Sequence, residues 1–226
     1  MKLLILGATG LVGSEALRQA LAHPDVTEVR APVRRPLTLE HPRLAAPVVD
    51  FADLESLRPD KTGRGDAQVL AGNDEWWKAD GVICALGTTL KAAGSREAFR
   101  RVDLELPLWF ARRARAAGAE RFALNSALGA DRGSRFFYSR VKGELEAELL
   151  DLDYPSLTLV RPGLIDGERA EVRHAERLGL ALSRGLRPLL PRQWRPSPVA
   201  RIAEALVQGA ISAPAGRHLV QARDLA

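Results

Sequence analysis

A short apolar run that ends in a glycine-rich turn limits most strongly how this chain can fold. Leu3–Leu6 is apolar throughout, as a buried strand of a parallel sheet should be, and Gly7–Gly13 follows it directly. Apolar residues then recur at helical spacing over Leu11–Ala22. The pattern predicts a strand, a tight turn and a helix, in that order.

The rest of the chain continues to alternate predicted strands and helices. We expect strands at 26–33, 47–49, 80–86, 121–126, 156–161 and 218–222, and helices at 95–117, 134–152, 171–186 and 199–210. This alternation predicts an α/β fold, a Rossmann-type doubly wound parallel sheet covered by helices on both faces. The length of 226 residues favours a single domain.

The glycines of the first turn recur at every third position, as GxxGxxG. Gly7 allows the tight turn, Gly10 lets backbone amides approach a pyrophosphate, and Gly13 lets the helix pack closely on the strand. The N-terminus of the helix then offers unpaired N–H groups to the phosphates. We therefore expect a dinucleotide to bind here, although an ordinary turn with close packing would use the same glycines.

The residues that follow the next strands bear on which dinucleotide binds. Arg34 and Arg35 come after the second strand, where an acid would favour NAD and an arginine tolerates the 2′-phosphate of NADP. This predicts NADP(H), with a solvated arginine pair as the alternative. Asp50 and Phe51 follow the third strand and are candidates to flank the adenine. Ala85–Thr89 would run close beneath the cofactor.

Tyr138 and Lys142 form a YxxxK pattern on a predicted helix. That spacing places both side chains on one face, where the ammonium can lower the phenol pKa and hold the nicotinamide ribose while the tyrosine transfers a proton. Ser126 ends the fifth strand and is placed to hydrogen-bond a substrate carbonyl. Ser126 lacks a GxSxG elbow, which argues against hydrolase chemistry.

Together these motifs resemble the short-chain dehydrogenases/reductases, specifically the atypical, extended-like group whose glycine loop reads GATGxxG. More narrowly, the chain resembles the Tat-interacting-protein oxidoreductase-like family and its small bacterial relatives. The resemblance is carried by residues 7–13, 33–35, 48–51, 84–89, 99–103, 126–131, 138–146 and 160–163.

The resemblance implies a Rossmann fold that binds NADPH, with Ser126, Tyr138 and Lys142 as the catalytic set. It assigns a cofactor-binding core to 1–163 and a C-terminal, substrate-side segment to 164–226. The predicted cofactor contacts are Gly7, Thr9, Gly10, Leu11, Val12, Gly13, Arg34, Arg35, Asp50, Phe51, Ala85, Leu86, Gly87, Thr88, Arg161, Pro162 and Gly163.

Two features keep other functions open. Many active members of the superfamily carry an asparagine on the helix after the fourth strand, which completes a proton relay. The matching turn of this chain reads Arg101-Val102-Asp103. The narrower family also includes members discussed as regulators, so the alternative to a carbonyl reductase is an NADPH sensor that acts through a partner. A sugar-nucleotide epimerase or dehydratase is a third reading, but about 60 residues after Gly163 leave little for a substrate lobe.

The charge is unevenly distributed. The net charge is +5, yet residues 169–201 hold eight arginines and two glutamates, a local charge of +6. A uniformly basic nucleic-acid binder is therefore disfavoured. The basic segment favours a small anionic substrate or a docking partner, with a solvated surface as the plain alternative. The oligomeric state, a homodimer included, stays open.

Composition excludes several kinds of chemistry. The one cysteine, Cys84, cannot form an internal disulfide and lies in an apolar strand, so we expect it in the core. The four histidines show no metal-ligand spacing, which predicts no metal site. No signal-peptide core and no long apolar stretch are found, from which we expect a cytoplasmic protein without a membrane span.

Overall fold

The computed structural model of the chain describes residues 1–51, 77–166 and 196–226. The polar stretch 58–74, the predicted helix 171–186 and most of the basic segment 169–201 lie outside these residues.

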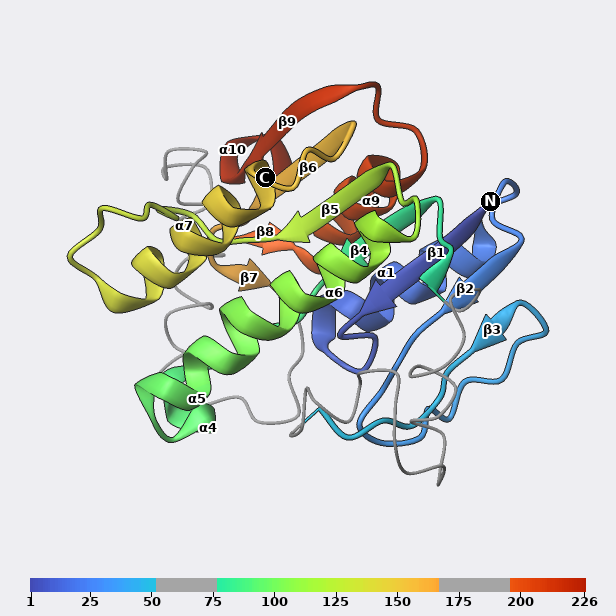
Figure 1. Ribbon diagram of the computed structural model, residues 1–226, viewed down its shortest axis with the longest axis horizontal. Coiled ribbons are helices and arrows are strands. Elements are labelled where there is room, and N and C mark those ends of the chain that lie inside the picture. Colours follow the sequence, from blue (N-terminus) through green and yellow to red (C-terminus); the bar gives the residue numbers. More distant parts are fainter. Residues whose placement is uncertain (52–76, 167–195) are drawn as a thin grey trace.

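A parallel sheet forms the centre of the molecule (Figure 1). In the described residues it has seven strands, in the order β3-β2-β1-β4-β5-β6-β9, and every neighbouring pair is parallel. The strands are β1 (Lys2–Leu6), β2 (Glu28–Arg30), β3 (Leu44–Ala45), β4 (Gly81–Cys84), β5 (Arg121–Asn125), β6 (Ser156–Arg161) and β9 (Gly216–Gln221). The order reverses direction at β1, so the predicted Rossmann-type, single-domain fold is confirmed.

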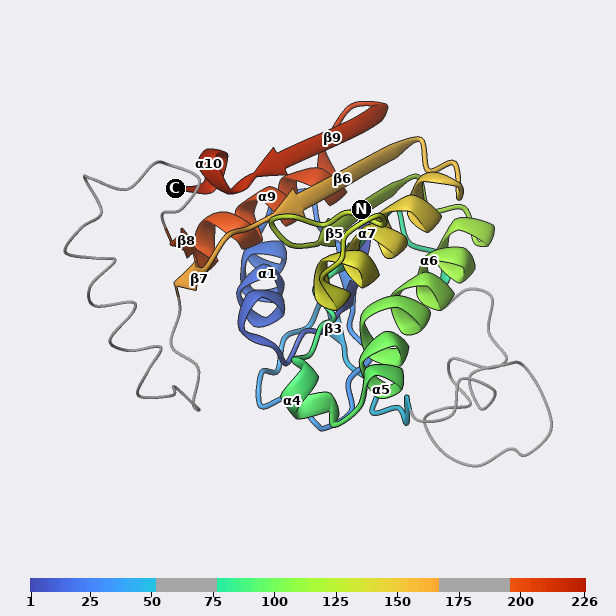
Figure 2. The same cartoon turned by 90° about the vertical axis from the view of Figure 1, so that its left-hand side faces the viewer.

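Helices cover both faces of the sheet (Figure 2). One face carries α1 (Leu11–Ala22) and α9 (Val199–Ile211), and the other carries α5 (Arg96–Arg100), α6 (Leu106–Ala116) and α7 (Phe137–Leu150). Successive side chains of β1 point to opposite faces. Leu3 and Ile5 therefore pack with α1 and α9, whereas Leu4 and Leu6 join the core beneath α6 and α7.

The predicted long helix 95–117 is interrupted. Ser95 begins it as expected, because its hydroxyl accepts a hydrogen bond from the Ala98 N–H. One π-helical turn, η1 (Arg101–Glu105), then separates α5 from α6. Apolar periodicity does not reveal such a turn, because it adds one residue to a helix that otherwise continues. A short helix that we did not predict, α4 (Leu90–Ala93), precedes it.

The second and third strands are shorter than predicted. Ladder pairing ends at Arg30 and Ala45, and only a bridge between Val33 and Val48 continues it. Ala31 and Val33 still donate to the carbonyls of Ala45 and Pro47, but Pro47 has no N–H group to donate in return, which explains the break in the ladder. The third strand therefore lies at Leu44–Ala45, before the predicted 47–49.

The C-terminal part completes the sheet. The last strand, β9, pairs with β6 over six residues, and α10 (Ala222–Leu225) follows it. A separate two-stranded ladder joins β7 (Ile165–Asp166) to β8 (Ser197–Pro198), just after β6 and just before α9. Of the described helices, none is both long and apolar enough to cross a membrane.

The packing of Phe110 predicts a large effect on stability. Its side chain is fully buried on α6, with ring contacts to Phe51, Trp77 and Trp109. We expect Phe110→Ala to lower the free energy of unfolding by about 3–5 kcal/mol in a denaturant titration, because it leaves a cavity. Phe136→Ala is the control, since Phe136 is 78% exposed. Equal losses for both variants would contradict this packing.

Candidate functional site

A cavity of about 430 Å³ opens where the turns after β1, β2 and β4 meet η1. Its predicted lining residues are Gly7, Thr9, Gly10, Arg34, Asp50, Phe51, Ala85, Leu86 and Gly87. Sequence reasoning missed Ala8, Pro32, Val33, Ala98, Arg101, Val102 and Leu106, which complete the lining. The cavity therefore lies at the carboxyl ends of the strands, where the strand order reverses and open α/β sheets bind ligands.

Close backbone approach explains the glycines at 7 and 13. Gly7 has a φ of +82°, and a Cβ on it would lie 2.6 Å from the carbonyl oxygen of Ala85. A Cβ on Gly13 would lie 2.0 Å from the carbonyl oxygen of Gly7. Gly10 begins α1 without a capping side chain, and the first turn of that helix has no acidic residue. The helix N-terminus thus faces the cavity with its N–H groups uncapped by any side chain.

Two arginines from separate elements line the cavity. Arg34 is exposed in the loop after β2, and Arg101 is exposed on η1. Arg35, which we also predicted to contact the cofactor, is exposed but does not line the cavity. The ring of Phe51 closes one side and packs edge-on against Phe110, 5.7 Å between centroids. The cavity therefore offers cations at its rim and an aromatic wall.

One face of α7 carries Tyr138, Lys142 and Glu146, each four residues from the next. Tyr138 is 40% exposed, and its ring packs against Phe99. The side chains of Lys142 and Glu146 are almost fully buried. This face turns toward the sheet. Lys142 lies near Gly87 in the turn after β4, and Glu146 reaches the ends of β5 and β6.

Lys142 makes an ion pair with Asp103 of η1. Its Nζ lies 2.7 Å from Oδ1 of Asp103, whose other carboxylate oxygen accepts a hydrogen bond from the Thr88 N–H at 2.8 Å. Burial by itself lowers the pKa of the Lys142 ammonium. The attraction of Asp103, Tyr138 and Cys84, together with the hydrogen bond to Asp103, outweighs it, so the pKa of Lys142 is raised. Lys142 therefore stays charged at neutral pH.

Ser126 and Arg161 both bind Glu146. The Ser126 hydroxyl donates to Oε1 of Glu146 at 2.5 Å, and Nε of Arg161 donates to the same oxygen at 2.9 Å. A second Arg161 nitrogen pairs with Oε2. The Arg161 side chain thus meets a carboxylate of α7, although we predicted it among the cofactor contacts. The one sequence feature that could have indicated a role for Glu146 is its position four residues after Lys142 on the same helix.

The other predicted contacts lie outside the cavity lining. Gly13, Leu11 and Val12 form the first turn of α1, and the Thr88 N–H is bound to Asp103. Pro162 and Gly163 follow β6, where the Leu128 N–H donates to the carbonyl of Pro162 and the Gly163 N–H donates to Ser197. Their roles toward a cofactor stay predictions.

Cys84 is fully buried in β4, and burial raises the pKa of its thiol to about 11. The thiol is therefore not an activated nucleophile. Within residues 1–51, 77–166 and 196–226, no group of three or more acidic, histidine or cysteine side chains is arranged to hold a metal ion.

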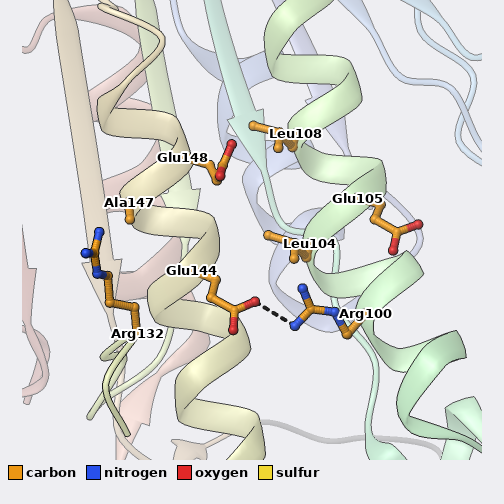
Figure 3. Close-up of a pocket in the computed structure, with 8 residues that line it drawn as sticks. All are labelled: Arg100, Leu104, Glu105, Leu108, Arg132, Glu144, Ala147 and Glu148. Carbon is orange, nitrogen blue, oxygen red and sulfur yellow. Dashed lines mark hydrogen bonds and ion pairs between the residues drawn. The ribbon is translucent and has the colours of Figure 1, made fainter.

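A second hollow of about 470 Å³ lies between α7 and the continuous helix formed by α5, η1 and α6 (Figure 3). Arg100 crosses it to donate a hydrogen bond to Glu144 at 2.6 Å. Arg132, Glu105 and Glu148 add charges of both signs along its walls. None of the sequence-predicted site residues lines this hollow, so we place the candidate site in the first cavity.

Comparison with known proteins gives the family. No protein-family model matches the chain. Protein HTATIP2 of Rattus norvegicus is 33% identical over 219 residues, which cover 94% of this chain and 82% of the rat protein. The chain belongs to the HTATIP2 family. This membership confirms the resemblance to the Tat-interacting-protein group that the motifs predicted.

Fungal proteins are also similar to this chain. Protein fmp52 of Aspergillus niger is 36% identical over 172 residues, which cover 76% of this chain and 70% of the fungal protein. That protein is named as mitochondrial, so our expectation of a cytoplasmic protein is wrong. The prediction rested on the absence of a signal-peptide core and of a long apolar stretch, which are signals for secretion and membrane insertion. Mitochondrial transit peptides are instead amphipathic and arginine-rich.

Solved structures of the same fold are more distant in sequence. MoeE5 in complex with UDP-glucose and NAD has a TM-score of 0.68 and 17% identity, covering 97% of this chain and 75% of that chain. WbmG of Bordetella bronchiseptica in complex with NAD has a TM-score of 0.67 and 15% identity, covering 98% and 72%. These likenesses show the fold.

The contact between Gly13 and Gly7 predicts a steric effect. We expect Gly13→Ala to lower the free energy of unfolding by about 2 kcal/mol in a denaturant titration, because the new methyl group would overlap a carbonyl oxygen. Gly133→Ala is the matched control, since its Cβ would lie 3.5 Å from Asp131, an ordinary contact. A Gly13→Ala protein as stable as the control would contradict this arrangement.

Proposed function

We propose that this protein is an NADP(H)-dependent oxidoreductase that interconverts a small carbonyl compound and its alcohol by hydride transfer. One observation carries the proposal: the glycine-lined cavity and the Tyr–Lys helix meet at Gly87. Gly87 lines the cavity, and a Cβ on it would lie only 3.7 Å from Nζ of Lys142. Family membership and the bound NAD of MoeE5 and WbmG support a nicotinamide nucleotide as cofactor.

The residues of the cavity fit a dinucleotide. Any side chain at Gly7 or Gly13 would collide with backbone, so these turns leave room for a pyrophosphate to approach the N-terminus of α1. Arg34 and Arg101 supply guanidinium groups suited to a phosphate, which favours NADP(H) over NAD(H). Asp50 and Phe51 also line the cavity and are the candidates for the adenosine end.

In the proposed reduction, a nicotinamide held in this cavity would supply the hydride to the carbonyl carbon. Tyr138 donates its phenolic proton to the carbonyl oxygen, which becomes the alcohol hydroxyl. The Lys142 ammonium, fixed by Asp103, stabilises the resulting phenolate and holds the nicotinamide ribose. Oxidation of the alcohol runs through the same groups in reverse.

Ser126 holds the substrate oxygen in this proposal. Its proton is donated to Glu146, so its lone pairs are directed to accept a hydrogen bond from an alcohol. To polarise a carbonyl oxygen, the hydroxyl must rotate its proton away from Glu146. Glu146 then keeps its two contacts with Arg161 and is not left unpaired.

The same contact favours a second candidate function. If the Ser126 proton stays with Glu146, the cavity retains NADP(H) without polarising a carbonyl, as a dinucleotide sensor would. The sensor is distinguished from the oxidoreductase by turnover, since both bind the dinucleotide.

The rim arginine predicts cofactor preference. We expect Arg34→Ala to raise the Kd for NADPH about tenfold and to leave the Kd for NADH nearly unchanged, because only NADPH carries the 2′-phosphate. Fluorescence titration measures both constants. Arg217→Ala serves as the control, because it removes the same charge from β9, at the opposite edge of the sheet. A wild-type preference for NADH would overturn the role of Arg34.

The proton donor predicts a loss of turnover. We expect Tyr138→Phe to lower kcat about a hundredfold or more across a panel of carbonyl compounds, with the Kd for NADPH changed less than about twofold. Tyr154→Phe is the control, because that hydroxyl donates to the Ala111 carbonyl inside the core. Near-zero turnover in the wild type and in both variants, alongside tight NADPH binding, favours the sensor.

A further inference from the structure

Asp103 is a buried carboxylate whose charge bears directly on the cavity. Its side chain is fully buried in η1 and is held from two sides, by Lys142 and by the Thr88 N–H.

The Asp103–Lys142 pair lies immediately behind the cavity wall. A Cβ on Gly87 would lie 3.4 Å from Oδ1 of Asp103 and 3.7 Å from Nζ of Lys142. Gly87 lines the cavity, as does Val102, the neighbour of Asp103 in the chain. Because Gly87 has no side chain, a group bound against it would sit close to both charges, with little solvent between them.

The two charges cancel each other at this wall. Lys142 alone would place a positive charge beside the bound group, and Asp103 reduces the sum to zero. The oxidised nicotinamide ring carries a positive charge and the reduced ring carries none. An uncompensated ammonium would therefore repel the oxidised cofactor and leave the reduced one unaffected to first order.

We propose that Asp103 is a positioning residue that fixes Lys142 and cancels its charge, so that the cavity retains NADP⁺ as well as NADPH. The inference rests on the proposed function, in which Lys142 meets the nicotinamide ribose. Asp103 thus sets the relative affinity of the site for the two redox states of the cofactor.

The test compares the Kd of NADP⁺ with that of NADPH. In Asp103→Asn, which keeps the size of the side chain, we expect the ratio of the Kd of NADP⁺ to the Kd of NADPH to rise about tenfold. Calorimetric titration measures both constants without a substrate. If Asp103 has a purely structural role, its substitution weakens the binding of both ligands by the same factor and leaves the ratio unchanged. That result would overturn the inference.

Removing the second charge provides a rescue. In the double variant Asp103→Asn with Lys142→Gln, the pair is again neutral, and we expect the ratio to return to within about twofold of the wild-type value although both ligands bind more weakly. Lys142→Gln alone leaves the carboxylate uncompensated and should lower the ratio below the wild-type value. If Asp103→Asn does not fold, these two variants decide the question. The proposal is contradicted if the ratio of the two Kd values does not follow the summed charge of residues 103 and 142 across these variants.

Glu105→Gln is the matched control. Glu105 belongs to the same π-helical turn, but it is exposed and lines the second hollow, away from the cavity (Figure 3). Its loss of charge should leave the ratio unchanged. If the wild-type protein binds neither NADP⁺ nor NADPH, the proposed function fails together with this inference. If it binds both and Asp103→Asn keeps the wild-type ratio, the inference alone fails.

Discussion

The close approach of three backbone segments determines the rest of the site. Gly7 touches the end of β4 at Ala85, and Gly13 brings the first turn of α1 against Gly7. These contacts leave no space for a Cβ, so the two turns and the helix N-terminus form one continuous surface. The cavity exists because the backbone itself, rather than side chains, forms this part of its wall.

Helix α7 joins that surface to the chemical groups. Tyr138, Lys142 and Glu146 share a face. Lys142 pairs with a carboxylate of η1, and Glu146 accepts a hydrogen bond from the hydroxyl of Ser126, just after β5. Each buried charge is paired, which is the condition under which charges persist in a protein interior. Breaking one of these pairs would leave an uncompensated charge beside the cavity. The same arrangement therefore restricts both folding and cofactor chemistry.

Local sequence patterns predicted the fold better than the contacts of the site. The bounds of α1 match the prediction, since apolar spacing and the glycine turn are local signals. The π-turn of η1 was missed, because periodicity carries no mark of a single added residue. The pairing of Arg161 with Glu146 was also missed, since it joins β6 to α7 across the fold. The predicted cytoplasmic location was wrong, because the absence of apolar segments does not specify a compartment.

The proposed hydride transfer goes beyond binding of the dinucleotide. It is tested most directly with NADPH that carries deuterium at the transferred position of the nicotinamide, incubated with the protein and a panel of carbonyl compounds. We predict an alcohol product that contains one deuterium at the former carbonyl carbon, detected by mass spectrometry. Saturation of the protein with NADPH and no deuterium in any product would contradict the account.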